Sequence, residues 1–211
     1  MRRFNVVDFF SSPHLRERVE THLQRGGAVI FPTDSLYGIG VDPGKDKALD
    51  TLFQLKEREE GKSFPLLVSE EAVVPQVFES VNPTVRRLME CFWPGKLTIV
   101  SRMKEKSYVK SISRDKTIGL RLPDSYISRE LARLCGGMIT GTSANKRSGE
   151  FPRNPDDILS DFSDDNVWVL EGGSLPPSRG STVVRVSGDE VKIIREGDIP
   201  EAEILFALEE C

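Results

Sequence analysis

Lysine and arginine residues form the clusters in this sequence that are best suited to chemistry. Lys56, Arg58 and Lys62 fall within seven residues, where a helical pattern ends and a polar segment begins. Three cations so close together could close around a polyphosphate. A lysine on the apolar stripe of a helix can also lay its stem along that stripe and keep its ammonium group in water. Both interpretations of Lys56 stay open on the sequence alone.

Arg121 lies in a segment, residues 117–122, that has the alternation of a β-strand. One face of this strand is apolar: Ile118, Leu120 and Leu122. The other face carries Thr117, Gly119 and Arg121. A glycine beside an arginine leaves room for a ligand, and the guanidinium fork suits a carboxylate or a phosphate. An internal salt bridge is the alternative for Arg121.

Two polar segments follow apolar runs that have the composition of buried strands. Residues 32–38 follow the run 28–31, and residues 141–149 follow the run 138–140. Because α/β sheets bind ligands at the carboxyl ends of their strands, both segments are candidate binding loops. The hydrogen bonds of a simple turn explain the first segment equally well. Two further polar residues lie among Val and Ile in the last expected strands: Ser181 and Arg195.

Several familiar catalytic signatures are absent. The two histidines, His14 and His22, both fall in the first expected helix, and no cysteine pair has metal-binding spacing, which argues against a metal site in the protein itself. Residues 94–98 lack the full P-loop pattern, and residues 38–40 lack the third glycine of a dinucleotide site. Residues 141–145 resemble the nucleophile elbow of a serine hydrolase, with Ser143 at its centre. No histidine lies where the catalytic base of such an enzyme would be expected. The chemistry that remains is positioning and charge stabilisation by Lys, Arg, hydroxyl groups and backbone amides.

The composition is that of a folded domain. The chain has 211 residues, of which 38% are hydrophobic and 29% charged. A chain of this length buries roughly 70% of the surface that it exposes when unfolded. Its apolar runs are too short for a transmembrane helix, and its first residues lack the pattern of a signal peptide. Since three widely spaced cysteines suit a reducing compartment, we expect a soluble cytoplasmic protein without membrane association.

Charge is unevenly distributed along the chain. The net charge is -4, but residues 154–211 hold fourteen acidic and four basic side chains, against nineteen acidic and twenty-five basic side chains in residues 1–153. The densest basic stretch is 102–121, with seven Lys or Arg residues. This stretch predicts either a solvated surface or a surface for a phosphate-bearing ligand or a nucleic acid.

Short apolar runs alternate with helical patterns along the chain. The expected strands are 28–31, 66–68, 97–101, 117–122, 138–140, 167–170, 181–186 and 191–195. The expected helices are 13–25, 46–58, 69–80, 83–92, 125–135 and one that begins near 154. Interleaved helices and strands favour an α/β sheet with helices on both faces, and the turn at 187–189 indicates a hairpin. We therefore expect a single α/β domain over residues 1–211, with one mixed β-sheet.

Seven segments, in chain order, resemble the signature of the YrdC family, the threonylcarbamoyl-AMP synthases. They are Pro32–Gly38, Lys56–Arg58, Trp93–Gly95, Thr117–Pro123, Thr142–Asn145 with Ser148–Gly149, Ser181–Val184 and Ile194–Gly197. Each motif is weak alone, but seven in order form a specific pattern that covers nearly the whole chain. The resemblance implies a twisted mixed β-sheet with helices on both faces and a cationic concave cleft. It also implies the short, TsaC-like form of the family without an extra C-terminal domain.

The resemblance implies an enzyme that makes threonylcarbamoyl-adenylate and pyrophosphate from L-threonine, bicarbonate and ATP. Partner proteins would then transfer the threonylcarbamoyl group to tRNA. Mg²⁺ would accompany ATP and be held mainly by its phosphates. The alternatives are a YrdC-like protein that binds tRNA or double-stranded RNA directly, and a paralogue without threonine-dependent synthase activity.

The resemblance also assigns roles to individual residues. The catalytic tetrad would be Lys56, Arg58, Ser143 and Asn145. Threonine would contact Thr33, Arg121, Ser143 and Ser181. ATP would be surrounded by Lys56, Arg58, Thr117, Ser143, Asn145 and Arg195, with Lys62 as a further loop contact.

Overall fold

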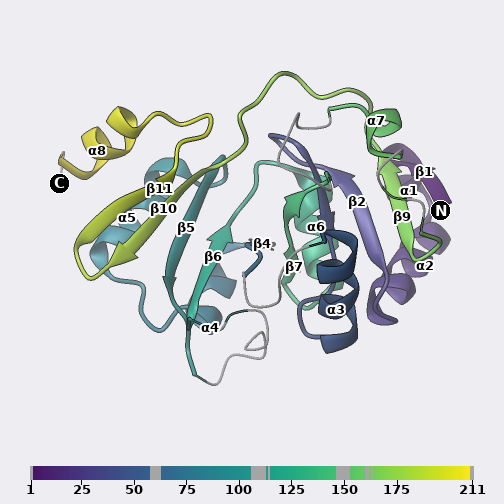
Figure 1. Ribbon diagram of the computed structural model, residues 1–211, viewed down its shortest axis with the longest axis horizontal. Helices are drawn as coiled ribbons and strands as arrows, with labels where there is room; N and C mark the ends of the chain where they lie inside the picture. Colours follow the sequence, from purple (N-terminus) through teal and green to yellow (C-terminus); the bar gives the residue numbers. More distant parts are fainter. Residues whose placement is uncertain are drawn as a thin grey trace.

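The computed structural model of the chain describes residues 2–57, 63–105, 113, 115–145, 153–159, 162 and 164–209. Its strands form two mixed β-sheets that lie side by side, with helices packed against both (Figure 1). The N-terminus lies at the outer edge of the first sheet, and the C-terminal helix lies near the outer edge of the second (Figure 1).

The first sheet has five strands in the spatial order β1, β9, β2, β3, β8. Their bounds are β1 (Arg2–Asn5), β9 (Val167–Glu171), β2 (Ala28–Pro32), β3 (Tyr37–Gly40) and β8 (Thr142–Ser143). β9 pairs in parallel with both β1 and β2, whereas β3 pairs antiparallel with β2 and β8. The short turn between β2 and β3 therefore lies at the carboxyl end of β2.

The second sheet has six strands in the spatial order β11, β10, β5, β6, β4, β7. Their bounds are β11 (Glu190–Arg195), β10 (Thr182–Ser187), β5 (Leu97–Arg102), β6 (Thr117–Arg121), β4 (Leu66–Val68) and β7 (Met138–Thr140). β10 and β11 form the expected antiparallel hairpin, and β10 pairs in parallel with β5.

Eight α-helices and one short 3₁₀ helix, η1, complete the described part of the chain. Their bounds are α1 (Val6–Ser11), α2 (Pro13–Gln24), α3 (Asp46–Leu55), η1 (Glu71–Val73), α4 (Val74–Val77), α5 (Pro83–Phe92), α6 (Tyr126–Leu134), α7 (Pro155–Leu159) and α8 (Glu201–Glu209). The start of α2 shows how local sequence sets these bounds. The Ser12 hydroxyl accepts a hydrogen bond from the backbone N–H of Leu15 at 3.2 Å, and Pro13 occupies the first turn.

The central strand β2 is buried on both faces, as expected for an α/β sheet. Val29 and Phe31 pack in one hydrophobic cluster with buried residues of α2 and α6. Ala28 and Ile30 pack in the other cluster, with buried residues of α3. All four side chains are fully buried because helices cover both faces of this strand. The mixed α/β architecture with helices on both faces is thus confirmed.

The expectation of one sheet is corrected, because the strands divide between two sheets at Gly141. β7 ends at Thr140 in the second sheet, and β8 begins at Thr142 in the first. A Cβ atom on Gly141 would lie 2.5 Å from the Leu67 side chain, so the chain can turn so close to β4 only with glycine here. This crossing brings polar residues of both sheets to one place.

Five elements were not expected from the sequence: β1, α1, β3, β8 and α8. β3 has the sequence Tyr-Gly-Ile-Gly, and its two glycines weaken the pattern of a strand. The expected helix 46–58 ends early, because Lys56 caps α3 and Glu57 has a φ of +47°. The expected helix 69–80 is only the short pair η1 and α4.

Candidate active site

A cavity of about 360 Å³ opens between the two sheets. This volume lies at the lower end of the roughly 300–1,000 Å³ that small-molecule sites occupy. The floor comes from β5, β6, β10 and β11 of the second sheet. The opposite wall comes from the β2–β3 turn and from residues 141–143, where the chain crosses between the sheets.

The floor follows from strand alternation. On β6, Thr117, Gly119 and Arg121 line the cavity, whereas Ile118 and Leu120 are fully buried on the other face. This arrangement confirms the predicted split of the strand. A Cβ atom on Gly119 would lie 3.1 Å from a methyl group of Thr98 on β5. Because glycine has no side chain, this part of the cavity stays open.

The β2–β3 turn is shaped by the hydroxyl group of Thr33. The Thr33 Oγ1 atom accepts hydrogen bonds from the backbone N–H groups of Ser35 and Leu36, both at 3.1 Å. It donates to the carbonyl oxygen of Leu36 at 2.7 Å. Local hydrogen bonds of this kind fix a turn without help from the rest of the fold. Thr33, Ser35 and Leu36 consequently line the cavity.

Arg121 is a buried cation held by three protein groups. Its Nη2 atom lies 2.6 Å from Oδ1 of Asp34, and the two side chains are 6% and 10% exposed. Its Nη1 and Nε atoms donate to Oγ of Ser35 at 3.1 Å and to the carbonyl oxygen of Gly95 at 2.8 Å. The internal salt bridge, which was the alternative, therefore exists. Arg121 also lines the cavity, so the two interpretations are compatible.

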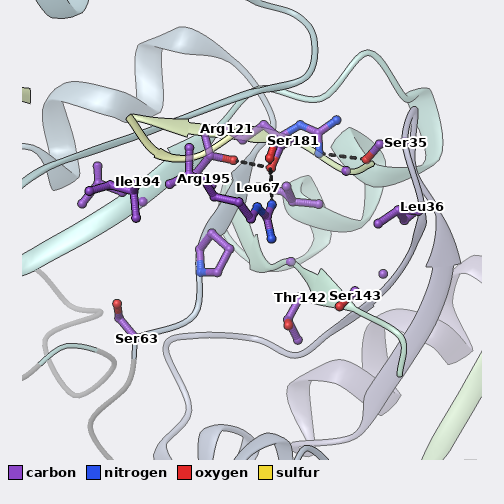
Figure 2. Close-up of a pocket in the computed structure, with 18 of the residues that line it drawn as sticks. Ser35, Leu36, Ser63, Leu67, Arg121, Thr142, Ser143, Ser181, Ile194 and Arg195 are labelled. Carbon is purple, nitrogen blue, oxygen red and sulfur yellow. Dashed lines mark hydrogen bonds between the residues drawn. The ribbon is translucent and has the colours of Figure 1, made fainter. Parts of the chain in front are cut away.

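Ser181 and Arg195 meet on the other side of the cavity floor. Arg195 Nη2 donates to the carbonyl oxygen of Ser181 at 2.8 Å and lies 3.3 Å from its hydroxyl oxygen. Figure 2 shows Arg195 reaching toward Ser181 beside Arg121. The Ser181 hydroxyl also accepts a hydrogen bond from Thr98 Oγ1 at 2.9 Å. Desolvation, and secondarily the charge of Arg121, lower the pKa of Arg195, so an anion between the two guanidinium groups would relieve their repulsion.

Lys56 ties the end of α3 to the loop that follows β8. Its ammonium group donates to the carbonyl oxygen of Ser143 at 2.7 Å, to Oδ1 of Asn145 at 3.2 Å, and to the carbonyl oxygen of Asn145. The Ser143 hydroxyl in turn donates to Asn145 Oδ1 at 2.7 Å. Ser143 lines the cavity, whereas Lys56 and Asn145 do not line it but contact Ser143. Three of the four residues of the predicted tetrad are thus in mutual contact.

The outer rim of the floor contains two charged residues that the sequence reasoning missed. Asp115 and Arg185 both line the cavity, and their charged groups lie 3.9 Å apart. Burial opposes ionisation of Asp115, but hydrogen bonds from Thr117 and Ser113 outweigh it and lower the pKa of the carboxyl group. The alternation of Ser181, directly before β10, with Val183 and Arg185 on β10 was the available signal for Arg185.

Two predicted site residues, Arg58 and Lys62, lie outside the described residues, as does the Ser148–Gly149 motif. Within the ranges that the structure covers, no three His, Cys, Asp or Glu side chains are placed to hold a metal ion together. Nor does any helix in those ranges have the length and apolar character needed to cross a membrane.

Comparison with known proteins gives a family for the chain. A family model for Sua5, YciO and YrdC proteins, described as "Telomere recombination", matches residues 21–197. A protein of Methanocaldococcus jannaschii named "Putative threonylcarbamoyl-AMP synthase" is 32% identical over 87% of this chain and 86% of its own length. The threonylcarbamoyl-AMP synthase of Thiobacillus denitrificans is 28% identical over 82% of this chain and 92% of its own.

The fold is shared with solved structures. The crystal structure of P. abyssi Sua5 complexed with L-threonine superposes with a TM-score of 0.84 at 22% sequence identity. It covers 98% of this chain, whereas this chain spans only 59% of that protein.

Proposed function

The chain belongs to the Sua5/YciO/YrdC family, and from this premise we propose that it is a threonylcarbamoyl-AMP synthase. It joins L-threonine, bicarbonate and ATP into threonylcarbamoyl-adenylate, with release of pyrophosphate, for the modification of tRNA. The observation that carries the proposal is the polar cavity in which Arg121, Ser181, Ser143 and Thr33 come together from both sheets. The names of the relatives support the same reaction.

The threonine end of the cavity is assigned to Arg121 and the hydroxyl groups around it. The guanidinium group has five N–H donors, and the contacts described above use three of them. The remaining two suit a carboxylate of the amino acid. Thr33, Ser143 and Ser181 add small hydroxyl groups that can bond the rest of a threonine molecule.

The ATP end of the site is assigned to residues of the opposite wall and of the floor. Ser143 lies between the cavity and the Lys56 ammonium group, so phosphates at Ser143 come close to this cation. Thr117 and Arg195 complete the set from the floor, and Asn145 holds Ser143 in place. Arg58 and Lys62 are assigned to the ATP site from their sequence motif alone, because both lie outside the described residues.

The chemistry needs alignment of anions more than proton transfer. The amine of threonine and bicarbonate give a carbamate and water, and a carboxylate oxygen of the carbamate then attacks the α-phosphorus of ATP. The bond from the α-phosphorus to the bridging oxygen breaks, and pyrophosphate leaves with the electron pair. Fixed cations stabilise the charge that gathers in this step, and a pre-formed site supplies the alignment. Mg²⁺ enters with ATP as part of the substrate complex.

This assignment makes the chain a nucleotidyltransferase that works in the cytoplasm and passes its product to the proteins that modify tRNA. Residues 1–211 are proposed to act as one domain, because the cavity needs strands of both sheets.

The proposal is tested by incubating the protein with Mg-ATP, L-threonine and bicarbonate. Pyrophosphate release and the mass of threonylcarbamoyl-adenylate are followed together. Both products are expected only when all three substrates are present, and replacement of threonine by alanine should reduce them strongly. Pyrophosphate without the adenylate indicates another acceptor carboxylate. If neither product forms while the protein binds double-stranded RNA in a strongly salt-dependent way, the RNA-binding alternative replaces this proposal.

A further inference from the structure

The buried carboxylate of Asp34 is a feature that the proposed reaction does not use. Its Oδ1 atom pairs with Arg121, but Oδ2 is buried and has no hydrogen-bond partner among the described residues. A buried ion pair with an unsatisfied oxygen is a poor source of stability, because the desolvation of both charges is only partly repaid. Such a pair therefore needs another explanation.

Turn formation does not explain Asp34. Asp in a tight turn usually bonds the backbone two residues further on. Here the Thr33 hydroxyl group takes that role and accepts from the N–H groups of Ser35 and Leu36. The carboxylate of Asp34 instead reaches across the fold to a residue 87 positions later in the chain. The Asp34 side chain therefore binds Arg121 and takes no part in the hydrogen bonds of the turn.

We propose that Asp34 is a positioning residue that orients the Arg121 guanidinium group for the amino-acid substrate, an inference that rests on the proposed function. Asp34, Ser35 and the carbonyl oxygen of Gly95 each hold a different nitrogen of Arg121. Three fixed points define the plane of the planar group. The two N–H groups left over, one on Nη1 and one on Nη2, then have fixed directions, and a substrate carboxylate can accept hydrogen bonds from them.

A charge-tuning role for Asp34 would have the opposite consequence. If Asp34 only neutralised Arg121, then removing its charge would strengthen the attraction of Arg121 for any anion. If Asp34 orients Arg121, its removal weakens the binding of threonine although the site becomes more positive. The sign of the change in threonine affinity thus separates the two roles.

The test compares Asp34→Asn and Asp34→Ala with wild type by calorimetric titration of L-threonine and, separately, of Mg-ATP. The expected result is a roughly tenfold weaker threonine affinity for Asp34→Asn, because the neutral amide holds the Arg121 guanidinium group less firmly than the carboxylate does. Asp34→Ala should be weaker again, since alanine also removes the remaining oxygen. The affinity for Mg-ATP should change less than twofold in both variants.

Glu130→Gln is the matched control. The Glu130 side chain is 6% exposed and pairs with Arg16 and Arg133, so it is as buried and as charged as Asp34. It does not line the cavity. A smaller loss of thermal stability is expected than for Asp34→Asn, because Arg16 and Arg133 are 49% and 44% exposed, and threonine affinity should be unchanged.

Unchanged or tighter threonine binding by Asp34→Asn overturns the proposal, as does an equal loss for threonine and Mg-ATP. If the Asp34 variants do not fold, Ser35→Ala removes a neighbouring support of Arg121 and should still weaken threonine binding about threefold. No effect of Ser35→Ala in that case also overturns it. Because titration needs no turnover, failure of adenylate synthesis by wild type would refute the proposed function and leave this test in place.

Discussion

Replacing Lys56 with methionine tests the link between α3 and the loop after β8. The variant keeps the stem of the side chain and removes its ammonium group. Three oxygen atoms of Ser143 and Asn145 then lose a charged donor. Asn145 is only 7% exposed, whereas Ser143 and Lys56 are half-buried, so water can replace part of the loss.

The magnitude follows from these contacts. A hydrogen bond to a charged group contributes about 1.5–3 kcal/mol, and partial replacement by water brings the expected loss of unfolding free energy to about 2 kcal/mol. For a domain of this size the melting temperature falls by roughly 2–4 °C per kcal/mol, so a decrease of about 4–8 °C is expected. Loss of one cation near the proposed position of the phosphates should slow adenylate formation at least tenfold, which corresponds to about 1.4 kcal/mol.

The assay is the initial rate of pyrophosphate release with threonine, bicarbonate and Mg-ATP, measured well below the melting temperature of the variant. Lys47→Met is the control, because Lys47 is an exposed residue of the same helix and should leave both rate and melting temperature unchanged. A wild-type rate for Lys56→Met would remove Lys56 from the site. An unchanged melting temperature would refute the contacts from which the magnitude was derived.

Three further outcomes are expected. Arg121→Ala should raise the KM for threonine at least tenfold while changing the KM for ATP less than twofold, and equal changes in both would argue against a threonine contact. Gly141→Ala should lower the unfolding free energy by about 1–3 kcal/mol in denaturant titration, because its Cβ atom meets Leu67, whereas Gly38→Ala meets only ordinary contacts and serves as the control. Burial lowers the pKa of His22, so the stability from its neutral ring is complete above a pH of about 6.5 and is lost as the pH falls below that value. The melting temperature should therefore decrease less between pH 7.5 and pH 5.5 in His22→Phe than in wild type, and equal decreases would contradict this reasoning.

Local periodicity determined much of what the sequence predicted correctly. The apolar alternation of residues 117–122 placed Thr117, Gly119 and Arg121 on one face of β6, and these residues line the cavity. Helix caps such as Ser12 depend on neighbours a few positions away, so their effects can be derived from a short segment. The motifs also indicated which residues belong together: Lys56, Ser143 and Asn145 are in contact.

Contacts between distant segments were beyond the reach of such patterns. Residues 37–40 gave only a weak strand signal, because their pairing with β2 and β8 and not their own propensity makes them a strand. The sequence also left Arg121 with two interpretations, a ligand contact or an internal salt bridge. Only the packed structure shows that it both pairs with Asp34 and lines the cavity.

The sequence by itself determined which side chains share a strand face or a helix stripe, because these relations repeat every two or 3.6 residues. The tertiary structure decided that the strands form two sheets, that Gly141 carries the chain from one to the other, and that Asp34 meets Arg121. These facts depend on strand register and on close approaches between residues far apart in the chain, and a local pattern contains neither.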